Sequence, residues 1–354
     1  MKKIWLVTGA AGHLGSALCS RLHECGEQVR ALVMRGEDTS FLRRMRAEIF
    51  FGDVTKPETL EAFFDAPADS RLIMLHCAGV VDIASRDNPA VDAVNVGGTE
   101  HVMRLCLAKH VSKVVYVCSV HAMPDLPKGR VKRELDGYDP TPLNGAYARS
   151  KARAAQLVLN MVRNDGLPAV LALPSGIIGP YCGKGNHLVQ LVKNYCCGKL
   201  PGVVKGGYDF VDVRDVALGV IAAAERGTIG ESYLLTGNFH TLKQTVSMLH
   251  EITGKKKVGV VPMWLARLAA PFAEQFAKRR RRKPLFTPYA LRVVLENARY
   301  SHDKATAELG YRPRELYETL EDTVEWLYET GEIPKEKLTA PKRCRRRAHS
   351  GAVG

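Results

Sequence analysis

A tyrosine and a lysine four residues apart, Tyr147 and Lys151, are the side chains best suited to proton transfer in this chain. The surrounding residues have a helical pattern, and positions i and i+4 lie on one face of a helix. A phenol has an ordinary pKa of about 10, and a neighbouring cation stabilises its phenolate form. The pair predicts general acid and base chemistry, although Tyr and Lys at this spacing also occur by chance.

Three glycines, Gly9, Gly12 and Gly15, follow the apolar run 4–7 and precede residues with helical periodicity. A strand, a glycine-rich turn and a helix bring backbone N–H groups and the positive end of a helix dipole to a pyrophosphate. An ordinary turn is the alternative, but the position directly after the first strand favours a dinucleotide. The residues expected to contact the cofactor here are Gly9, Ala11, Gly12, His13, Leu14 and Gly15.

Arg35 stands at the end of the second expected strand, where an NAD-binding chain carries an acidic residue for the ribose 2′-hydroxyl. A guanidinium there suits a 2′-phosphate, so NADP(H) is favoured over NAD(H). Glu37 and Asp38 lie close enough to bind the hydroxyl instead, which leaves NAD(H) open.

Asp53 follows the third expected strand and is predicted to accept a hydrogen bond from the adenine amino group. Its alternative role is the N-cap of the next helix, for which Thr55 is better placed. After the fourth strand, Cys77, Ala78 and Gly79 supply small residues where backbone must approach a ligand.

Short apolar runs alternate with helical patterns up to Pro174, which predicts an α/β fold with a doubly wound parallel sheet. We expect a Rossmann-type dinucleotide-binding domain at 1–174, to which segments around 205–236 return. A smaller substrate-binding lobe at 175–330 and a basic, disordered tail at 331–354 complete the expected organisation.

The net charge of +14 comes almost entirely from two short basic runs, 278–283 and 335–347, each with a net charge of +6. A uniformly basic surface for nucleic acid is therefore disfavoured. The nine cysteines have no regular spacing, so we expect reduced thiols, a cytoplasmic protein and no metal site. No apolar run approaches the length of a membrane span, about 20 residues.

In combination, these motifs resemble the extended short-chain dehydrogenase/reductase family, over residues 2 to about 330. The matches are the glycine turn, Asp53-Val54, the Asn95-Val96-Gly97-Gly98-Thr99 motif, Ser119 after the fifth strand, Tyr147 with Lys151, the segment from Pro174 through Ile177 to Pro180, and Phe210 to Val216. The dihydroflavonol-reductase and 3β-hydroxysteroid-dehydrogenase-like branch is the most similar, although several of its motifs are shared with nucleotide-sugar epimerases and dehydratases. Cys118 departs from the hydroxyl residue usual in the family.

The resemblance implies roles for these residues. Tyr147 exchanges a proton with the substrate oxygen, Lys151 holds the nicotinamide ribose, and Ser119 hydrogen-bonds the reacting oxygen. Asn95 orders a water behind Lys151 or caps a bend in its helix, and Pro174 and Ile177 flank the nicotinamide. A homodimer is also implied.

Three other features have two interpretations each. His121 could reach the substrate, but a solvent-facing loop residue is favoured, and His76 is expected to be a hydrogen-bonded core residue. Residues 263–277, followed by the basic run 278–283, are either a lobe helix with a charged loop, which is favoured, or an interfacial amphipathic helix. Contact with anionic membranes is thus the less favoured alternative.

The sequence as a whole favours an NAD(P)-dependent oxidoreductase that interconverts a ketone or aldehyde and an alcohol on a small, fairly apolar, steroid-like or dihydroflavonol-like substrate. A nucleotide-sugar epimerase or dehydratase with tightly bound NAD is the first alternative. A redox-sensing NAD(P)-binding protein without turnover is the second, and the set of Ser119, Tyr147 and Lys151 argues against it.

Overall fold

The computed structural model describes residues 2–82, 88–181, 185–279 and 287–334. The chain divides into two compact units. The first comprises residues 1–175, 213–236 and 300–313, and the second comprises 176–212, 237–299 and 314–354. The expected tail at 331–354 lies mostly outside the described residues, as do most of the basic runs 278–283 and 335–347.

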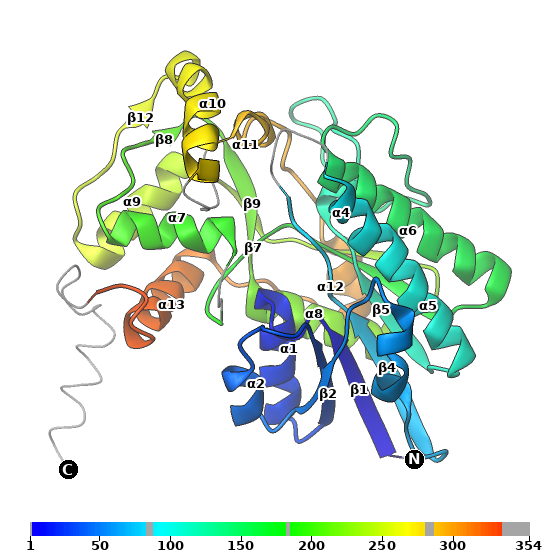
Figure 1. Ribbon diagram of the computed structural model, residues 1–354. Helices are drawn as coiled ribbons and strands as arrows, with labels where there is room; N and C mark the ends of the chain where they lie inside the picture. Colours follow the sequence, from blue (N-terminus) through cyan, green and yellow to red (C-terminus); the bar gives the residue numbers. More distant parts are fainter. Residues whose placement is uncertain (1, 83–87, 182–184, 280–286, 335–354) are drawn as a thin grey trace, which may run out of the picture. The chain divides into compact units, whose positions relative to one another are not determined.

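The first unit is built on a seven-stranded sheet in the order β10-β6-β5-β4-β1-β2-β3, and every neighbouring pair is parallel (Figure 1). Strands β5, β6 and β10 are buried along their whole length, and β1, β2 and β4 are buried except at their first one or two residues, as a sheet covered on both faces requires. The doubly wound parallel sheet expected from the sequence is confirmed. Its strands are β1 (Lys2–Thr8), β2 (Gln28–Val33), β3 (Glu48–Phe51), β4 (Ser70–His76), β5 (Lys113–Val117), β6 (Ala169–Pro174) and β10 (Ser232–Leu235).

Helices pack on both faces of this sheet. Helix α1 packs against α8, and α8 against α12, whereas α4 and α5 both pack against α6 (Figure 1). The 20-residue helix α6 runs from Gly145 at its N-cap to Gly166 at its C-cap, and Gly166 has the left-handed conformation that favours glycine. The helices of this unit are α1 (His13–Glu24), α2 (Ser40–Arg44), α3 (Glu61–Phe64), α4 (Pro89–Asp92), α5 (Thr99–Ala108), α6 (Ala146–Asp165), α8 (Val213–Arg226) and α12 (Asp303–Leu309).

The sequence predicts one continuous helix over 89–110, but the structure interrupts it with a π-helix, η2 (Ala93–Gly98). Wider turns of this kind insert an extra residue into a helix and are frequent at functional sites. The insertion falls on the Asn95 to Thr99 motif. It changes the angular position of Asn95 relative to the flanking helices α4 and α5.

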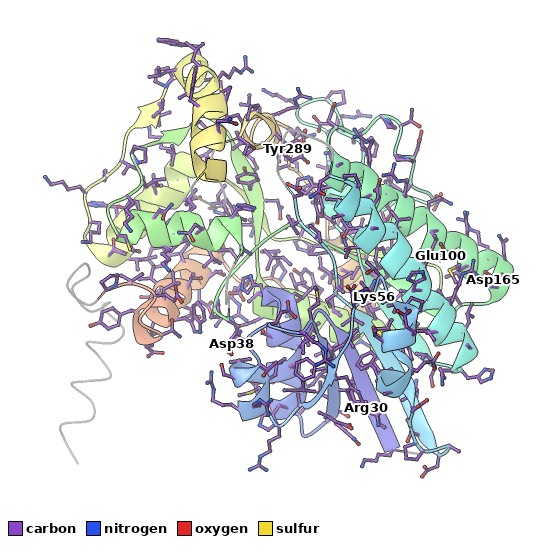
Figure 2. The ribbon with its side chains drawn as sticks, viewed as in Figure 1. Arg30, Asp38, Lys56, Glu100, Asp165 and Tyr289 are labelled. Carbon is purple, nitrogen blue, oxygen red and sulfur yellow. The ribbon has the colours of Figure 1, made fainter. Side chains whose placement is uncertain are left out.

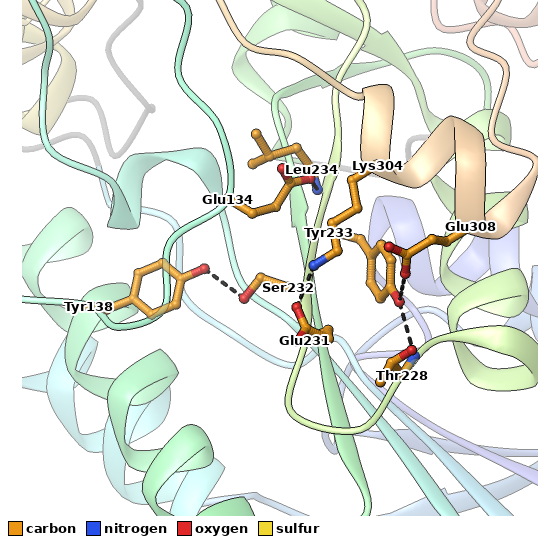
Figure 3. Close-up of polar contacts among 9 residues, drawn as sticks. All are labelled: Glu134, Tyr138, Thr228, Glu231, Ser232, Tyr233, Leu234, Lys304 and Glu308. Atoms are coloured by element: carbon orange, nitrogen blue, oxygen red, sulfur yellow. Dashed lines mark hydrogen bonds and ion pairs between the residues drawn. The ribbon is translucent and has the colours of Figure 1, made fainter.

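Residues far apart in the sequence fix the edge strand β10 to the rest of the first unit (Figure 3). The backbone N–H of Leu234 donates to the Glu134 carboxylate at 3.0 Å, and the Tyr138 hydroxyl donates to Ser232 at 2.9 Å. On the other side, the Tyr233 hydroxyl donates to the Glu308 carboxylate of α12 at 2.6 Å. These contacts occupy polar groups that an edge strand would otherwise expose.

The second unit contains two small sheets and five helices among its described residues. A three-stranded sheet has the order β11-β9-β7, and β12 pairs with β8. Its core includes Tyr195, Phe210, Leu249 and Leu320. The elements are β7 (Gly176–Ile178), α7 (His187–Cys196), β8 (Val203–Val204), β9 (Gly207–Asp212), β11 (Asn238–Thr241), α9 (Leu242–Thr253), β12 (Val260–Val261), α10 (Met263–Arg279), α11 (Pro288–Val293) and α13 (Leu316–Glu329).

Candidate functional site

The strand order reverses direction between β1 and β4 in the first unit. From β1 the chain builds outward to β2 and β3, and from β4 it builds the other way to β5 and β6. In open parallel sheets, ligands bind at the carboxyl ends of the strands where this reversal occurs. Thr8 and His76 are paired residues at those two ends, and the glycine turn and Cys77 follow them directly.

The glycine turn between β1 and α1 has no room for side chains at two positions. Gly9 has φ +63°, and an added Cβ would lie 2.9 Å from the backbone of Ala78. A Cβ on Gly15 would lie 2.2 Å from the carbonyl oxygen of Gly9, so helix and turn are in close contact. Helix α1 begins after Gly12 without a side-chain cap or an acidic residue in its first turn. This helix start fits a bound pyrophosphate.

A buried histidine connects the turn to helix α5. Thr8 Oγ1 accepts the backbone N–H groups of Cys77 and Ala78, both at 3.1 Å, so its own hydroxyl hydrogen is available for His76 Nδ1 at 2.8 Å. His76 Nε2 then carries the ring hydrogen and donates to Thr99 Oγ1 at 3.1 Å. His76 is therefore a hydrogen-bonded core residue, as expected. Burial lowers its pKa to about 3, which keeps the ring neutral.

Asn95 extends this network from the π-helix to helix α6. The Thr99 hydroxyl donates to the Asn95 carbonyl oxygen at 2.7 Å. The Asn95 side chain accepts the N–H of Val80 at 2.8 Å and donates to the Val80 carbonyl at 3.0 Å and to Ser150 Oγ at 2.9 Å. Ser150 in turn donates to the carbonyl oxygen of Tyr147 at 2.8 Å. The buried amide thus joins the loop after β4 to the turn of α6 that carries Tyr147.

Lys151 lies beside this network with its side chain buried. Its ammonium donates to the carbonyl oxygen of Val117 at 3.0 Å and lies 5.2 Å from the centre of the Tyr116 ring. A Cβ on Gly79 would lie 3.4 Å from Lys151 Nζ, so the small residue leaves space next to the ammonium. Burial lowers the pKa of Lys151, while it raises the pKa of Cys118 to about 11. Cys118 is thus a neutral thiol.

Tyr147 and Ser119 converge near His121. Ser119 follows β5, and its Oγ accepts the backbone N–H of His121 at 3.2 Å. The His121 ring meets the Tyr147 ring edge to face, with centres 6.0 Å apart. His121 is therefore half-buried against Tyr147 and does not merely face solvent, as the sequence had favoured. Burial, followed by the charge of Lys132, lowers the His121 pKa to about 4.

At the end of β2, Arg35 is exposed and its guanidinium lies 5.8 Å from the centre of the Phe51 ring. The two nearby acidic residues bond to local backbone. The carboxylate of Glu37 accepts a hydrogen bond from the backbone N–H of Met34 at 2.8 Å. The carboxylate of Asp38, labelled in Figure 2, accepts a hydrogen bond from the backbone N–H of Ser40 at 2.9 Å. Both carboxylates thus already accept local hydrogen bonds.

Asp53 forms a tight turn after β3. Its Oδ1 accepts the backbone N–H and the hydroxyl of Thr55, at 2.9 and 2.8 Å, and the first of these bonds is the main reason that its pKa is lowered. The expectation that Thr55 caps the next helix is wrong. The following turn η1 (Pro57–Thr59) starts after Lys56, and its N-cap makes no side-chain hydrogen bond. The Thr55 hydroxyl is used by Asp53 instead.

The remaining predicted cofactor residues lie in different parts of the chain. Val54 packs against the π-helix, where a Cβ on Gly98 would approach it to 2.6 Å. Pro174 ends β6 in the first unit, and Ile177 lies in β7 of the second unit. Among the described residues, no group of three or more His, Cys, Asp or Glu side chains could hold a metal ion. The described helices also include none long and apolar enough to cross a membrane.

A hollow of about 440 Å³ on the outer face of α5 and α6 contains none of the predicted site residues. Glu100 and Asp165, labelled in Figure 2, are among the residues that line it. It is therefore separate from the carboxyl edge of the sheet.

Sequence reasoning missed the residues that hold the site together, namely Thr8, Thr99 and Ser150. Each lies beside a recognised residue: Thr8 before the glycine turn, Thr99 at the end of the Asn95 motif and Ser150 before Lys151. Their hydroxyls could have been expected to serve buried polar groups, but their partners are 23 to 70 residues away or within one helical turn.

Comparisons with known proteins find relatives that cover most of the chain. A family model described as the NAD dependent epimerase/dehydratase family matches residues 5–235. The chain is similar to sterol demethylase protein B of Methylococcus capsulatus, with 30% identity over 93% of this chain and 99% of the relative. It is 31% identical to a 4-hydroxy-2-methyl-3-oxo-4-farnesyl-3,4-dihydroquinoline-1-oxide ketoreductase of Stigmatella aurantiaca, over 87% of this chain and 91% of the relative. The solved structure of gox2253 is 31% identical, with a TM-score of 0.78 over 93% and 99% of the two chains.

The neutral, buried His76 predicts a specific pH dependence of stability. The folded state holds its pKa at about 3, below the ordinary value of 6.5. The unfolded chain therefore binds the proton first, and stability present above pH 6.5 is lost as the pH falls toward 3. Replacing His76→Gln should reduce the stability loss between pH 7 and pH 5, measured by urea unfolding, by about 2 kcal/mol.

His110→Gln, at an exposed histidine, is the matched control and should leave the pH dependence unchanged. An equal loss of stability on acidification in the wild type and in His76→Gln would contradict the assignment of a neutral ring to His76.

Proposed function

The chain belongs to the NAD-dependent epimerase/dehydratase family of extended short-chain dehydrogenases/reductases, and from this premise we propose that it reduces a ketone or aldehyde, or oxidises the corresponding alcohol, with NADP(H). The substrate is small and fairly apolar, of the steroid-like or dihydroflavonol-like kind. The observation that carries the proposal is the placement of Tyr147 and Lys151 on α6, joined through Asn95 to the carboxyl edge of the sheet.

The dinucleotide, when bound, supplies or accepts the hydride at its nicotinamide ring. Gly9, Gly12 and Gly15 let backbone reach the pyrophosphate, and the uncapped start of α1 stabilises its negative charge. Asp53 accepts a hydrogen bond from the adenine amino group. Pro174 and Ile177 flank the nicotinamide.

The proton is handled by the protein. Tyr147 donates it to the substrate oxygen during reduction and removes it during oxidation. Ser119 donates a hydrogen bond to the same oxygen, and Lys151 holds the nicotinamide ribose beside Gly79. Asn95 is a positioning residue, because it contacts Ser150 and Val80 and fixes the turn of α6 that presents Tyr147.

The names of two relatives support an apolar substrate, and one of them also supports carbonyl chemistry. The Stigmatella aurantiaca relative is named as a ketoreductase of a farnesylated quinoline, and the Methylococcus capsulatus relative is named as a sterol demethylase protein. Both align over more than four fifths of this chain. The family also includes epimerases and dehydratases, so a nucleotide-sugar epimerase is the competing proposal.

NADP(H) is proposed over NAD(H) because of the charges at the end of β2. Arg35 is exposed there, whereas Glu37 and Asp38 already accept backbone hydrogen bonds. A guanidinium forms charge-assisted hydrogen bonds to a 2′-phosphate. A carboxylate at the same position would repel that phosphate.

Replacing Tyr147→Phe tests the proton-transfer role. The variant removes only the hydroxyl, so turnover should fall about 100-fold to 10,000-fold while NADPH affinity stays within a few-fold. The assay is a screen of steroids, flavonoid-like ketones, small aldehydes and nucleotide sugars, followed through the absorbance of free reduced cofactor.

Tyr317→Phe, at an exposed tyrosine of α13, is the matched control and should keep full turnover. Full turnover by Tyr147→Phe would refute the mechanism. Conversion of a nucleotide sugar without net oxidation of free cofactor would favour the epimerase.

Replacing Arg35→Gln tests the choice of cofactor. Loss of a charge-assisted contact should weaken NADPH binding about 10-fold to 100-fold and leave NADH binding nearly unchanged. Fluorescence titration with each reduced cofactor measures both dissociation constants without a substrate. Arg21→Gln, in the last turn of α1 and paired with Glu24, is the control. An unchanged ratio of the two constants in Arg35→Gln would contradict the NADP(H) assignment.

A further inference from the structure

Helix α10 of the second unit, labelled in Figure 1, carries an exposed row of large apolar side chains by their relative exposure. Trp264, Leu268 and Phe272 are 65%, 62% and 77% exposed, and Leu265 beside them is 45% exposed. These four positions fall within an arc of about 100° at 3.6 residues per turn, so they form one stripe along the helix.

The orientation of α10 is the reverse of that in an ordinary amphipathic helix. Three described residues of α10 face the core of the unit, and two of them are alanines: Ala270 is 1% exposed, and Met263 and Ala266 pack against the core cluster. They lie on the side opposite the stripe. A helix whose large side chains served only the core would bury Trp264, Leu268 and Phe272 and expose the alanines.

The sequence on either side of this stripe is strongly basic. Between residues 255 and 283 the sequence has ten Lys and Arg residues and one acidic residue, Glu274, so this segment holds +9 of the net charge of +14. Lys256 and Lys257 are exposed just before β12, and Arg267 is exposed on α10 itself. Residues 280–286 lie outside the described residues, and only their charge in the sequence enters the argument.

We propose that the stripe of α10, namely Trp264, Leu265, Leu268 and Phe272, docks this protein on an anionic lipid surface. An in-plane helix inserts aromatic and aliphatic side chains at the boundary between headgroups and acyl chains, and flanking cations interact with anionic headgroups. The sequence alone favours a lobe helix for 263–277; the structure shows that the same helix leaves the four large side chains of the stripe uncovered.

The charge distribution favours a lipid surface over a second copy of the chain. Two copies that met through the stripe would bring two segments of +9 together, and this repulsion opposes a symmetric interface. Anionic lipid instead attracts the flanking charge and accepts the apolar side chains. Such docking would also place the enzyme next to the phase in which apolar carbonyl compounds dissolve.

Sedimentation of the full chain with vesicles tests the proposal without any substrate or turnover. Vesicles of phosphatidylcholine and phosphatidylserine in equal parts should bind the protein, whereas vesicles of phosphatidylcholine alone should bind it at least about 10-fold more weakly. Added salt should weaken the binding, because it screens the cations.

The double variant Leu268→Ser, Phe272→Ser should lose at least about 10-fold in affinity for the mixed vesicles, since both side chains are exposed and their removal spares the core. The matched control is the double variant Leu218→Ser, Phe239→Ser. These two side chains are 43% and 40% exposed and lie outside α10, so the control should bind vesicles as the wild type does. Lys256→Glu with Lys257→Glu should weaken binding to mixed vesicles only.

Three results would overturn the proposal. The first is no binding to mixed vesicles, and the second is equal binding by the wild type and the Leu268→Ser, Phe272→Ser variant. The third is a wild-type dimer in sedimentation velocity that is lost in this double variant, together with no vesicle binding. The stripe would then be an interface between two copies of the chain.

Discussion

The site depends on one buried amide, the side chain of Asn95, which must satisfy its hydrogen bonds inside the protein. It does so with both backbone groups of Val80 and with the hydroxyl of Ser150. A buried polar group without partners is costly, so this geometry is strongly enforced. The loop after β4 and the helix α6 are therefore held at a fixed separation, and Lys151 lies beside them.

The same hydrogen-bond network includes Thr8, the residue just before the glycine turn. The hydrogen bonds run from Thr8 through His76 and Thr99 to the backbone of Asn95, with one direction of donation throughout. A neutral His76 is needed for this direction, because Nδ1 must accept while Nε2 donates. In this account, the groups expected to bind pyrophosphate and those expected to transfer the proton are parts of one polar network.

Much of this architecture was predictable from the sequence. Strand and helix periodicity gave the parallel sheet, and the glycine spacing and the Tyr147–Lys151 pair placed the expected chemistry at its carboxyl edge. The π-helix was not predictable, because the apolar pattern of 89–110 is that of one uninterrupted helix, and the Asn95 side chain bonds to partners distant in the sequence. The contact of His121 with Tyr147 and the use of Thr55 by Asp53 likewise depend on loop geometry. Periodicity also gave α10 as amphipathic, but it could not show which face the core covers.

The most direct test of this account is the turnover of Asn95→Asp beside that of the wild type, on one carbonyl substrate and with NADPH affinity measured in parallel. The carboxylate keeps the acceptor for Val80 and loses both donated hydrogen bonds, so Tyr147 should shift from its position while the glycine turn is unaffected. A variant that circular dichroism shows to be folded should lose about 100-fold or more in kcat, since small misplacements of reacting groups have effects of this size, and its affinity for NADPH should change much less. Full turnover in the folded variant would contradict the claim that Asn95 positions the proton donor.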